Sequence, residues 1–191
     1  MEPPAHPLYE QPWPEGEFRY VQLGFVVDDV LTAAARWARV FGIGPFTVLP
    51  RLTSTCTYRG AEVEQDMQIA VAQAGPVQIE LIQQYHDGPS IFRDMYAAGT
   101  SGFHQICTLT QDFDGKTAYF ERLGYEIAAS LDSRGHRVAY IDTVKDFGFF
   151  TEVVASTPRF LAQLAQLAET CATWDGTDPV RLLTRDGYRT P

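Results

Sequence analysis

Apolar and polar positions along the first part of the chain predict one strand, one helix and three further strands. The run YVQLGFVV, which starts at Tyr20, is typical of a buried strand, and Asp28 and Asp29 after it supply a helix cap. Between Val30 and Phe41 apolar side chains recur with helical spacing, which predicts an amphipathic helix. Strands are then predicted over residues 46–58, 64–72 and 77–83.

The same order of elements returns in the second half of the chain. The segment HQICTLT predicts a strand, a helix follows over 116–123, and strands follow over 126–131, 137–142 and 149–155. QLGFVVDDV corresponds to QICTLTQDF, and QIELIQQ corresponds to FTEVVAS. This internal duplication predicts two equivalent modules, residues 20–84 and 104–156.

Three segments lie outside the two modules. Residues 1–19 contain five prolines and predict an extended arm. Residues 85–103 form a linker, with a helical turn expected over 90–97. In the last segment, 157–191, an apolar stripe predicts a helix over 158–170. The remaining tail is expected to be irregular.

Composition excludes several classes of protein. Fifteen basic residues against 24 acidic ones give a formal charge of −9, and the only two lysines argue against nucleic acid or an anionic membrane as partner. No apolar run has the length of a membrane span, and the sequence opens with no signal-peptide pattern. Three dispersed cysteines without a CxxC pair favour a reducing compartment. We therefore expect a cytoplasmic protein.

Two glutamates occupy matching strands of the duplication. Glu80 lies within the apolar run VQIELI, and Glu152 lies within FTEVVA. Burying an unpaired carboxylate is costly, so two of them at equivalent points are difficult to explain as surface charges. The pair therefore indicates a functional site. The chain has only four histidines, so a metal site would depend on other ligands.

A doubled βαβββ module with these landmarks resembles the vicinal oxygen chelate superfamily. Its members include glyoxalase I, methylmalonyl-CoA epimerase, bleomycin-resistance proteins and extradiol dioxygenases, and the resemblance covers residues 20–156. It implies an α+β fold in which two tandem βαβββ modules form a curled, barrel-like mixed sheet around a cleft, flanked here by the N-terminal arm and the C-terminal helix. It also implies a divalent metal in the cleft, held by the first and last strand of each module, and a homodimer.

Carried onto this sequence, the resemblance assigns Gln22, Glu80 and Glu152 as metal ligands. The fourth ligand is Gln105 or His104. Gln22 lies six residues before Asp28, and Gln105 lies six residues before Gln111, which favours Gln105; a one-residue bulge would instead restore His104. Such an oxygen-rich set favours Mg, Mn, Co or Ni over structural Zn. It also disfavours a dioxygenase, which needs two histidines around iron.

The resemblance also implies catalytic and substrate-binding residues. The superfamily's common step removes a proton next to a carbonyl, and Glu152 or Glu64 would be the base. Glu64 matches the strand position of the catalytic glutamate of methylmalonyl-CoA epimerase, although Gln65 and Asp66 depart from the surrounding motif. His136, Tyr140 and Asp142 alternate along RVAYIDT and would contact the substrate.

Two hypotheses of different class follow. The first is a metal-dependent lyase or isomerase, of epimerase or glyoxalase type, acting on a small carbonyl or acyl substrate and stabilising its enolate. The alternative is a metal-free protein that sequesters an aromatic or amphipathic small molecule, as bleomycin-resistance relatives do. The aromatic content of 13% favours this alternative. A single-domain dioxygenase ranks third.

Overall fold

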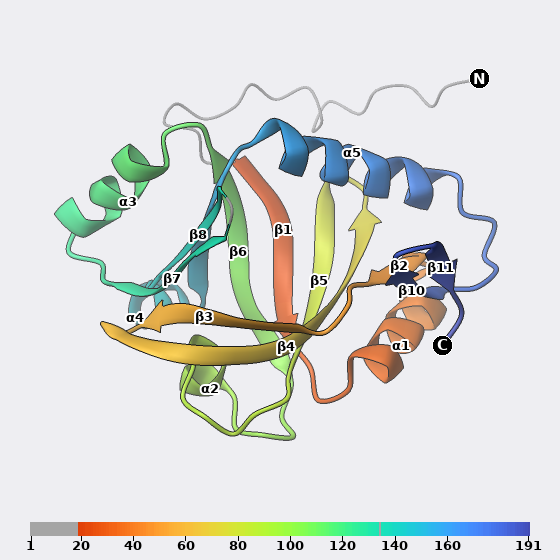
Figure 1. Cartoon of the computed structure of the whole chain (residues 1–191), viewed down its shortest axis with the longest axis horizontal. Coiled ribbons are helices and arrows are strands. Elements are labelled where there is room, and N and C mark those ends of the chain that lie inside the picture. Colours follow the sequence, from red (N-terminus) through yellow and green to blue (C-terminus); the bar gives the residue numbers. More distant parts are fainter. Residues whose placement is uncertain (1–18, 134) are drawn as a thin grey trace.

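The computed structural model describes residues 19–133 and 135–191 of the chain, except for the side chain of Arg19. Residues 1–18, which make up nearly all of the predicted arm, lie outside the described residues. Eight strands close into a ring in the order β4-β3-β7-β8-β9-β6-β1-β5, and pairing of β4 with β5 completes it. Helices lie outside this ring (Figure 1). The predicted α+β barrel-like fold is confirmed.

The first module follows the predicted order of elements closely. It comprises β1 (Arg19–Val26), α1 (Val30–Phe41), β2 (Phe46–Val48), β3 (Leu52–Tyr58), β4 (Ala61–Ala74) and β5 (Val77–Gln84). Helix α1 begins where the Asp29 carboxylate accepts a 2.7 Å hydrogen bond from the Thr32 N–H, and it ends at Gly42 with φ 67°. The strand expected over 46–58 is two strands, because the segment between them contains Pro50, which has no N–H for a ladder.

The second module repeats the order with one addition. After α2 (Ile91–Met95) come β6 (Gly102–Thr110), α3 (Phe113–Arg122), β7 (Ile127–Ser133), β8 (His136–Ile141), α4 (Val144–Phe147) and β9 (Phe150–Ala155). The short helix α4 is not anticipated by the sequence pattern.

The two modules meet along their first strands. Strand β1 pairs antiparallel with β6, while β5 lies parallel to β1 and β9 lies parallel to β6. The order β5-β1-β6-β9 therefore places the first and last strands of both modules side by side. These are the strands that carry the two matching glutamates and the candidate amide ligands.

The C-terminal segment is more ordered than the sequence predicts. Helix α5 (Pro158–Ala172) is confirmed, but the tail expected to be irregular forms β10 (Val180–Thr184) and β11 (Gly187–Arg189). That prediction was wrong because β10 is fixed by a distant partner, the parallel strand β2. Helix α5 crosses one end of the barrel (Figure 1). Its far end is held where the Cys171 thiol contacts the Gln73 N–H and the Pro45 carbonyl.

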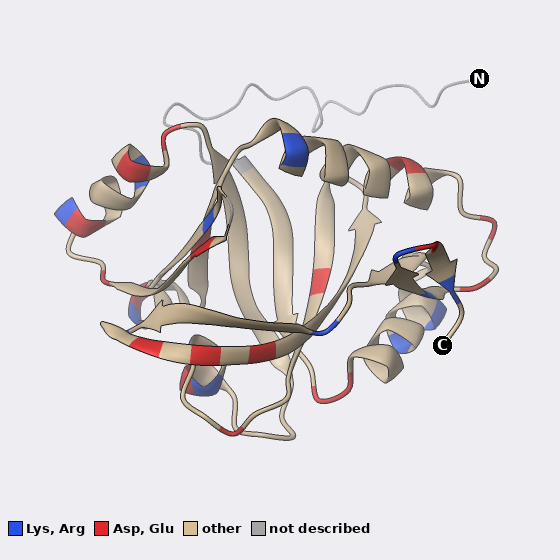
Figure 2. Cartoon of the chain, in the orientation of Figure 1, with Lys and Arg blue, Asp and Glu red and all other residues tan. Residues whose placement is uncertain are grey.

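Charged residues are mostly on the outside of the barrel. Figure 2 shows acidic bands along β4, where Glu62 and Glu64 are exposed, and a single acidic band on β5. The only acidic residue of β5 is Glu80, which is 8% exposed. Among the described residues, no helix has the length and apolar character needed to cross a membrane.

Candidate functional site

Four polar side chains come together where the first and last strands of the modules meet. Gln22 comes from β1, Glu80 from β5, Gln105 from β6 and Glu152 from β9. The Gln105 Nε2 atom donates to Glu80 Oε2 at 3.0 Å and reaches Glu152 Oε2 at 3.5 Å. Gly24 pairs with both Glu80 and Gln105, and a Cβ on Gly24 would collide with the Gln105 side chain. The glycine therefore lets the amide cross β1 to the carboxylate.

The two carboxylates are buried and face each other without a basic partner. Glu80 is 8% and Glu152 is 6% exposed, and among residues 19–133 and 135–191 neither forms an ion pair. Burial, together with the charge of Glu152, raises the pKa of Glu80 well above its usual value. Burial also raises the pKa of Glu152, although hydrogen bonds from Tyr140, Cys107 and Gln105 oppose the shift. The site therefore holds uncompensated acidic groups.

A bulge in β6 decides how His104 and Gln105 are placed. Gly24 pairs with Gln105 while Phe25 pairs with Phe103, so His104 is the extra residue of a bulge. The His104 ring stacks on Phe150 with centroids 4.9 Å apart, and its Nε2–H donates to the Ile91 carbonyl at 3.0 Å. Its Nδ1 contacts the Gln105 amide oxygen. Gln105, and not His104, is therefore the side chain that reaches the carboxylates.

Burial also affects the imidazole itself. His104 is fully buried, and burial lowers its pKa. A ring that donates to a backbone carbonyl and packs between Phe92 and Phe150 is a structural element of the barrel wall.

The carboxylate pair opens onto a cavity of about 410 Å³ inside the barrel. Gln22, Glu80, Glu152, His136 and Tyr140 all line it. Most of the remaining wall is apolar and comes from β3, β4, β7, β8, β9, α5, β10 and β11. Volumes of this size are typical of small-molecule sites.

Not every predicted residue reaches the cavity. Glu64 is exposed, whereas its neighbour Gln65 is buried and lines the cavity, so the two point to opposite faces of β4. Asp142 binds the Arg59 guanidinium at 2.8 Å and does not line the cavity. His136 and Tyr140 do line it, and burial raises the pKa of the Tyr140 phenol well above its usual value.

Among the buried polar residues that line the cavity, the sequence interpretation assigned no role to Gln78 and Thr47. Both are buried, at 4% and 5% exposed. A signal existed for the first, because Gln78 stands two residues before Glu80 in VQIEL and must share its face of the strand. Thr47 had no such signal, since the sequence analysis predicted a single strand over 46–58 in place of β2 and β3.

The chemistry of the donor set suits a hard divalent ion once the Gln105 amide turns over, because its nitrogen now donates to the carboxylates and its oxygen contacts His104. Two carboxylates and two amide groups can supply oxygen ligands, the type that Mg and Mn prefer. Within the described residues no three His, Cys, Asp or Glu side chains gather into a metal-binding group. An ion here would therefore need the amides of Gln22 and Gln105 beside the carboxylates of Glu80 and Glu152.

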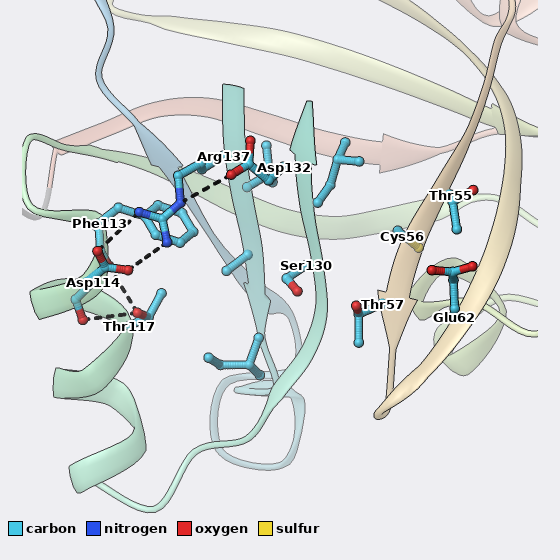
Figure 3. A pocket seen from close by; sticks show the side chains of 14 residues that line it. Thr55, Cys56, Thr57, Glu62, Phe113, Asp114, Thr117, Ser130, Asp132 and Arg137 are labelled. Atoms are coloured by element: carbon cyan, nitrogen blue, oxygen red, sulfur yellow. Dashed lines mark hydrogen bonds and ion pairs between the residues drawn. The ribbon is translucent and has the colours of Figure 1, made fainter. Parts of the chain in front are cut away.

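A second hollow, of about 470 Å³, lies on the other side of the barrel wall, between α3, β7 and β3 (Figure 3). Its cation is already paired, since the Arg137 guanidinium binds Asp114 at 2.6 Å and lies over the Phe113 ring. Cys56 and Ser130 line both spaces. With Arg137 and Asp114 paired to each other, this hollow is a weaker candidate than the cavity that contains the two glutamates.

Comparisons with known proteins agree with this architecture. The sequence profile of the Glyoxalase/Bleomycin resistance protein/Dioxygenase superfamily matches residues 21–140. A comparison with curated proteins finds no match. Methylmalonyl-CoA epimerase from Mycobacterium tuberculosis superposes with a TM-score of 0.52 at 17% identity, covering 75% of this chain and 91% of that one.

Two further solved structures behave similarly. A Streptomyces coelicolor methylmalonyl-CoA epimerase variant in complex with 2-nitronate-propionyl-CoA gives a TM-score of 0.53 at 17% identity, covering 75% and 97% of the two chains. A hypothetical protein from Bacillus halodurans gives 0.53 at 15% identity, covering 73% and 94%. At these identities the likeness shows a shared fold.

Proposed function

The chain belongs to the Glyoxalase/Bleomycin resistance protein/Dioxygenase superfamily, and on that premise we propose that it is a metal-dependent lyase or isomerase that removes a proton next to a substrate carbonyl. The observation that carries the proposal is the pair Glu80 and Glu152, buried at the cavity without an ion-pair partner among the described residues. Buried acidic groups of this kind are stabilised by a bound cation or by taking up a proton. Both responses suit proton-transfer chemistry.

Four side chains would hold the ion: Gln22, Glu80, Gln105 and Glu152. When bound, a divalent ion supplies polarisation of the substrate carbonyl and of the enolate oxygen that develops from it. The Gln105 Nε2 atom contacts both carboxylates, and a bound ion would replace these contacts.

Glu152 is the proposed base. Hydrogen bonds from the Tyr140 hydroxyl and the Cys107 thiol orient its carboxylate, and burial raises its pKa, which makes it a stronger base than an exposed glutamate. It would take the proton from the substrate C–H and return it to the carbanion. Glu64, the other candidate from the sequence, is exposed on the far face of β4 and is less well placed.

His136 and Tyr140 would contact the body of the substrate, since both line the cavity. The homodimer and the cytoplasmic location expected from the sequence stay predictions.

The proposal is tested by incorporation of solvent deuterium, measured by mass spectrometry. Methylmalonyl-CoA and a neutral aromatic ketone are incubated in heavy water with Mg, Mn or Co and with the wild type, Glu152→Gln or Glu121→Gln. Glu121 is an exposed residue of α3 and serves as the matched control. We expect metal-dependent exchange that falls at least about a hundredfold in Glu152→Gln and is retained in Glu121→Gln. Exchange that is equal in all three proteins would contradict the proposal.

A second candidate function is metal-free binding of a small molecule. The contact of Gln105 Nε2 with both carboxylates favours it, because this bridge already satisfies the pair in part without an ion. The two functions separate in thermal unfolding. A real metal site raises the melting temperature with increasing ion concentration, according to RT ln(1 + [L]/Kd), whereas a metal-free binding protein shows no such dependence.

A further inference from the structure

Two polar groups in the cavity wall have no hydrogen-bond partner in the described part of the chain. They are the Gln78 amide nitrogen and the Thr47 hydroxyl. Both residues line the cavity and are more than nine-tenths buried. A buried donor without a partner is costly and is rare in proteins, so it points to a group that the cavity receives.

The strand register places both groups next to the proposed catalytic side chains. Gln78 pairs with Gln22 across β5 and β1. Thr47 pairs with Val71 of β4, and Val71 in turn pairs with Glu80. Neighbours across a ladder project from the same face of a sheet, so the two unpaired groups lie on the inner wall beside the carboxylates. A ligand at the carboxylates would extend along them.

The charge of the wall restricts what the cavity can receive. Among the described residues that line it there is no Lys or Arg, and the only acidic ones are Glu80 and Glu152. The polar remainder consists of amides, hydroxyl groups, a thiol and one imidazole. An anionic ligand would enter an acidic, mainly apolar space without a cation from these walls, at a high cost in desolvation.

The roof of the cavity is apolar and belongs to a part of the chain beyond the superfamily match. That match ends at residue 140, whereas α5 contributes Phe160, Leu164 and Leu167 beside Gln163 and Gln166, and the C-terminal hairpin contributes Leu183 and Tyr188, so the roof is mainly apolar. The apolar roof is therefore supplied by this chain's own C-terminal segment. It favours a ligand whose bulk is hydrocarbon.

We propose that the cavity binds a neutral, mainly apolar ketone, with an oxygen of the ligand accepting a hydrogen bond from Gln78 Nε2. Thr47 provides a second polar contact on the same wall. The inference rests on the proposed function in so far as it names the substrate class of the same site. A neutral, apolar ligand would differ from that of the structural neighbour, which is bound to a propionyl-CoA derivative.

The test is a fluorescence titration of metal-free protein with prodan, a neutral naphthyl ketone whose emission depends on its surroundings. We expect saturable binding of one molecule per chain, about tenfold weaker in Gln78→Met because the ketone loses its donor. The matched control is Gln68→Met, since the Gln68 amide donates to the Leu49 carbonyl and lies outside the cavity lining. Dimethylaminonaphthalene, the same ring without the ketone, should bind wild type and Gln78→Met equally.

A second variant covers the case in which Gln78→Met does not fold. Thr47→Val is nearly isosteric and should weaken prodan about threefold while retaining the wild-type circular dichroism. Prodan binding that is absent, or unaffected by whichever variant folds, overturns the inference. So does displacement of prodan by an equal concentration of propionyl-CoA.

The outcomes are distinguishable from those of the proposed function. Metal-dependent deuterium exchange into methylmalonyl-CoA, without prodan binding, would support the proposed function and overturn the substrate class. Gln78-dependent prodan binding, without exchange on any substrate or metal, would support the substrate class and overturn the catalytic role.

Discussion

Acidic residues gather at two places in this barrel, and the two places differ in what balances their charge. Outside the cavity, the Arg59 guanidinium binds Asp94 and Asp142, each at 2.8 Å, which ties the turn between β3 and β4 to α2 and to the end of β8. Inside, Glu80 and Glu152 have only amide, hydroxyl and thiol donors. The first cluster is complete within the protein, whereas the second would be stabilised further by the proposed ion.

The difference shows in the direction of the pKa shifts. Hydrogen bonds to Asp142 and Asp94 raise the pKa of Arg59, so the guanidinium stays charged. Burial raises the pKa of both Glu80 and Glu152, so this pair favours its protonated form. Ion-paired clusters such as that of Arg59 contribute to the stability of the fold. Buried carboxylates without a cation, such as Glu80 and Glu152, lower the stability but are poised to bind an ion or a proton.

The largest effect is expected from the double substitution Glu80→Gln/Glu152→Gln. A carboxyl whose folded pKa is raised favours the folded state below its unfolded pKa of about 4.3, and this contribution is lost as pH rises through the folded value. Metal-free wild type should therefore lose stability above about pH 4.3 relative to the variant. At pH 8 the variant should be more stable by about 2 kcal/mol or more, as measured by urea unfolding.

The same variant should lose all metal-dependent stabilisation. Its matched control is Glu121→Gln on the surface of α3, which should unfold like the wild type at every pH. Parallel pH profiles for wild type and double variant would show that burial of the two carboxylates costs nothing, and would remove the contrast with the Arg59 cluster.

A smaller effect is expected from His104→Leu. The substitution removes the donor to the Ile91 carbonyl and should cost about 2 kcal/mol in the free energy of unfolding. His86 is the control, because its ring only accepts from the Gly88 N–H in a loop, and His86→Leu should cost well under about 1 kcal/mol.

Because Gln105 is the residue that reaches the carboxylates, Gln105→Leu should weaken metal binding far more than His104→Leu. The reverse order would make His104 the ligand.

The smallest effect is expected from Arg59→Met. Its ion pairs are partly exposed, with the guanidinium side chain 34% accessible, so their loss should cost about 1–2 kcal/mol. Metal affinity should not change, since the cluster does not line the cavity. Arg36→Met, on the exposed face of α1, is the control and should unfold like the wild type. A loss of metal binding in Arg59→Met would show that the two acidic regions are coupled.

The elements that the sequence predicted best are those with local signals. Helix α1 has its predicted bounds because Asp29 and Gly42 cap the apolar repeat from both sides. The strand β10 was missed because it depends on pairing with β2, far away along the chain, and nothing within 180–184 specifies that partner. The periodicity of apolar residues predicts which face of an element is buried, but it does not identify the distant strand with which that element pairs.

The same distinction applies to the candidate site. The duplication identified Glu80 and Glu152 as partners before their positions in space were known. The spacing favoured Gln105 but left His104 open, and only the contacts of the folded chain separate the two, because the bulge turns both side chains into the interior. The unpaired donor of Gln78 is also invisible in the sequence, since a missing partner is a property of the folded cavity.

The most direct test of the central claim, that the buried glutamate pair is completed by a divalent ion, is calorimetric titration of chelator-treated protein with Mn or Co. Repeating it in buffers of different ionisation enthalpy counts the protons released. We predict one ion per chain, release of protons from the raised-pKa pair, and no binding in Glu80→Gln/Glu152→Gln while Arg59→Met binds normally. Absence of binding by the wild type, or equal binding by the double variant, would contradict the account.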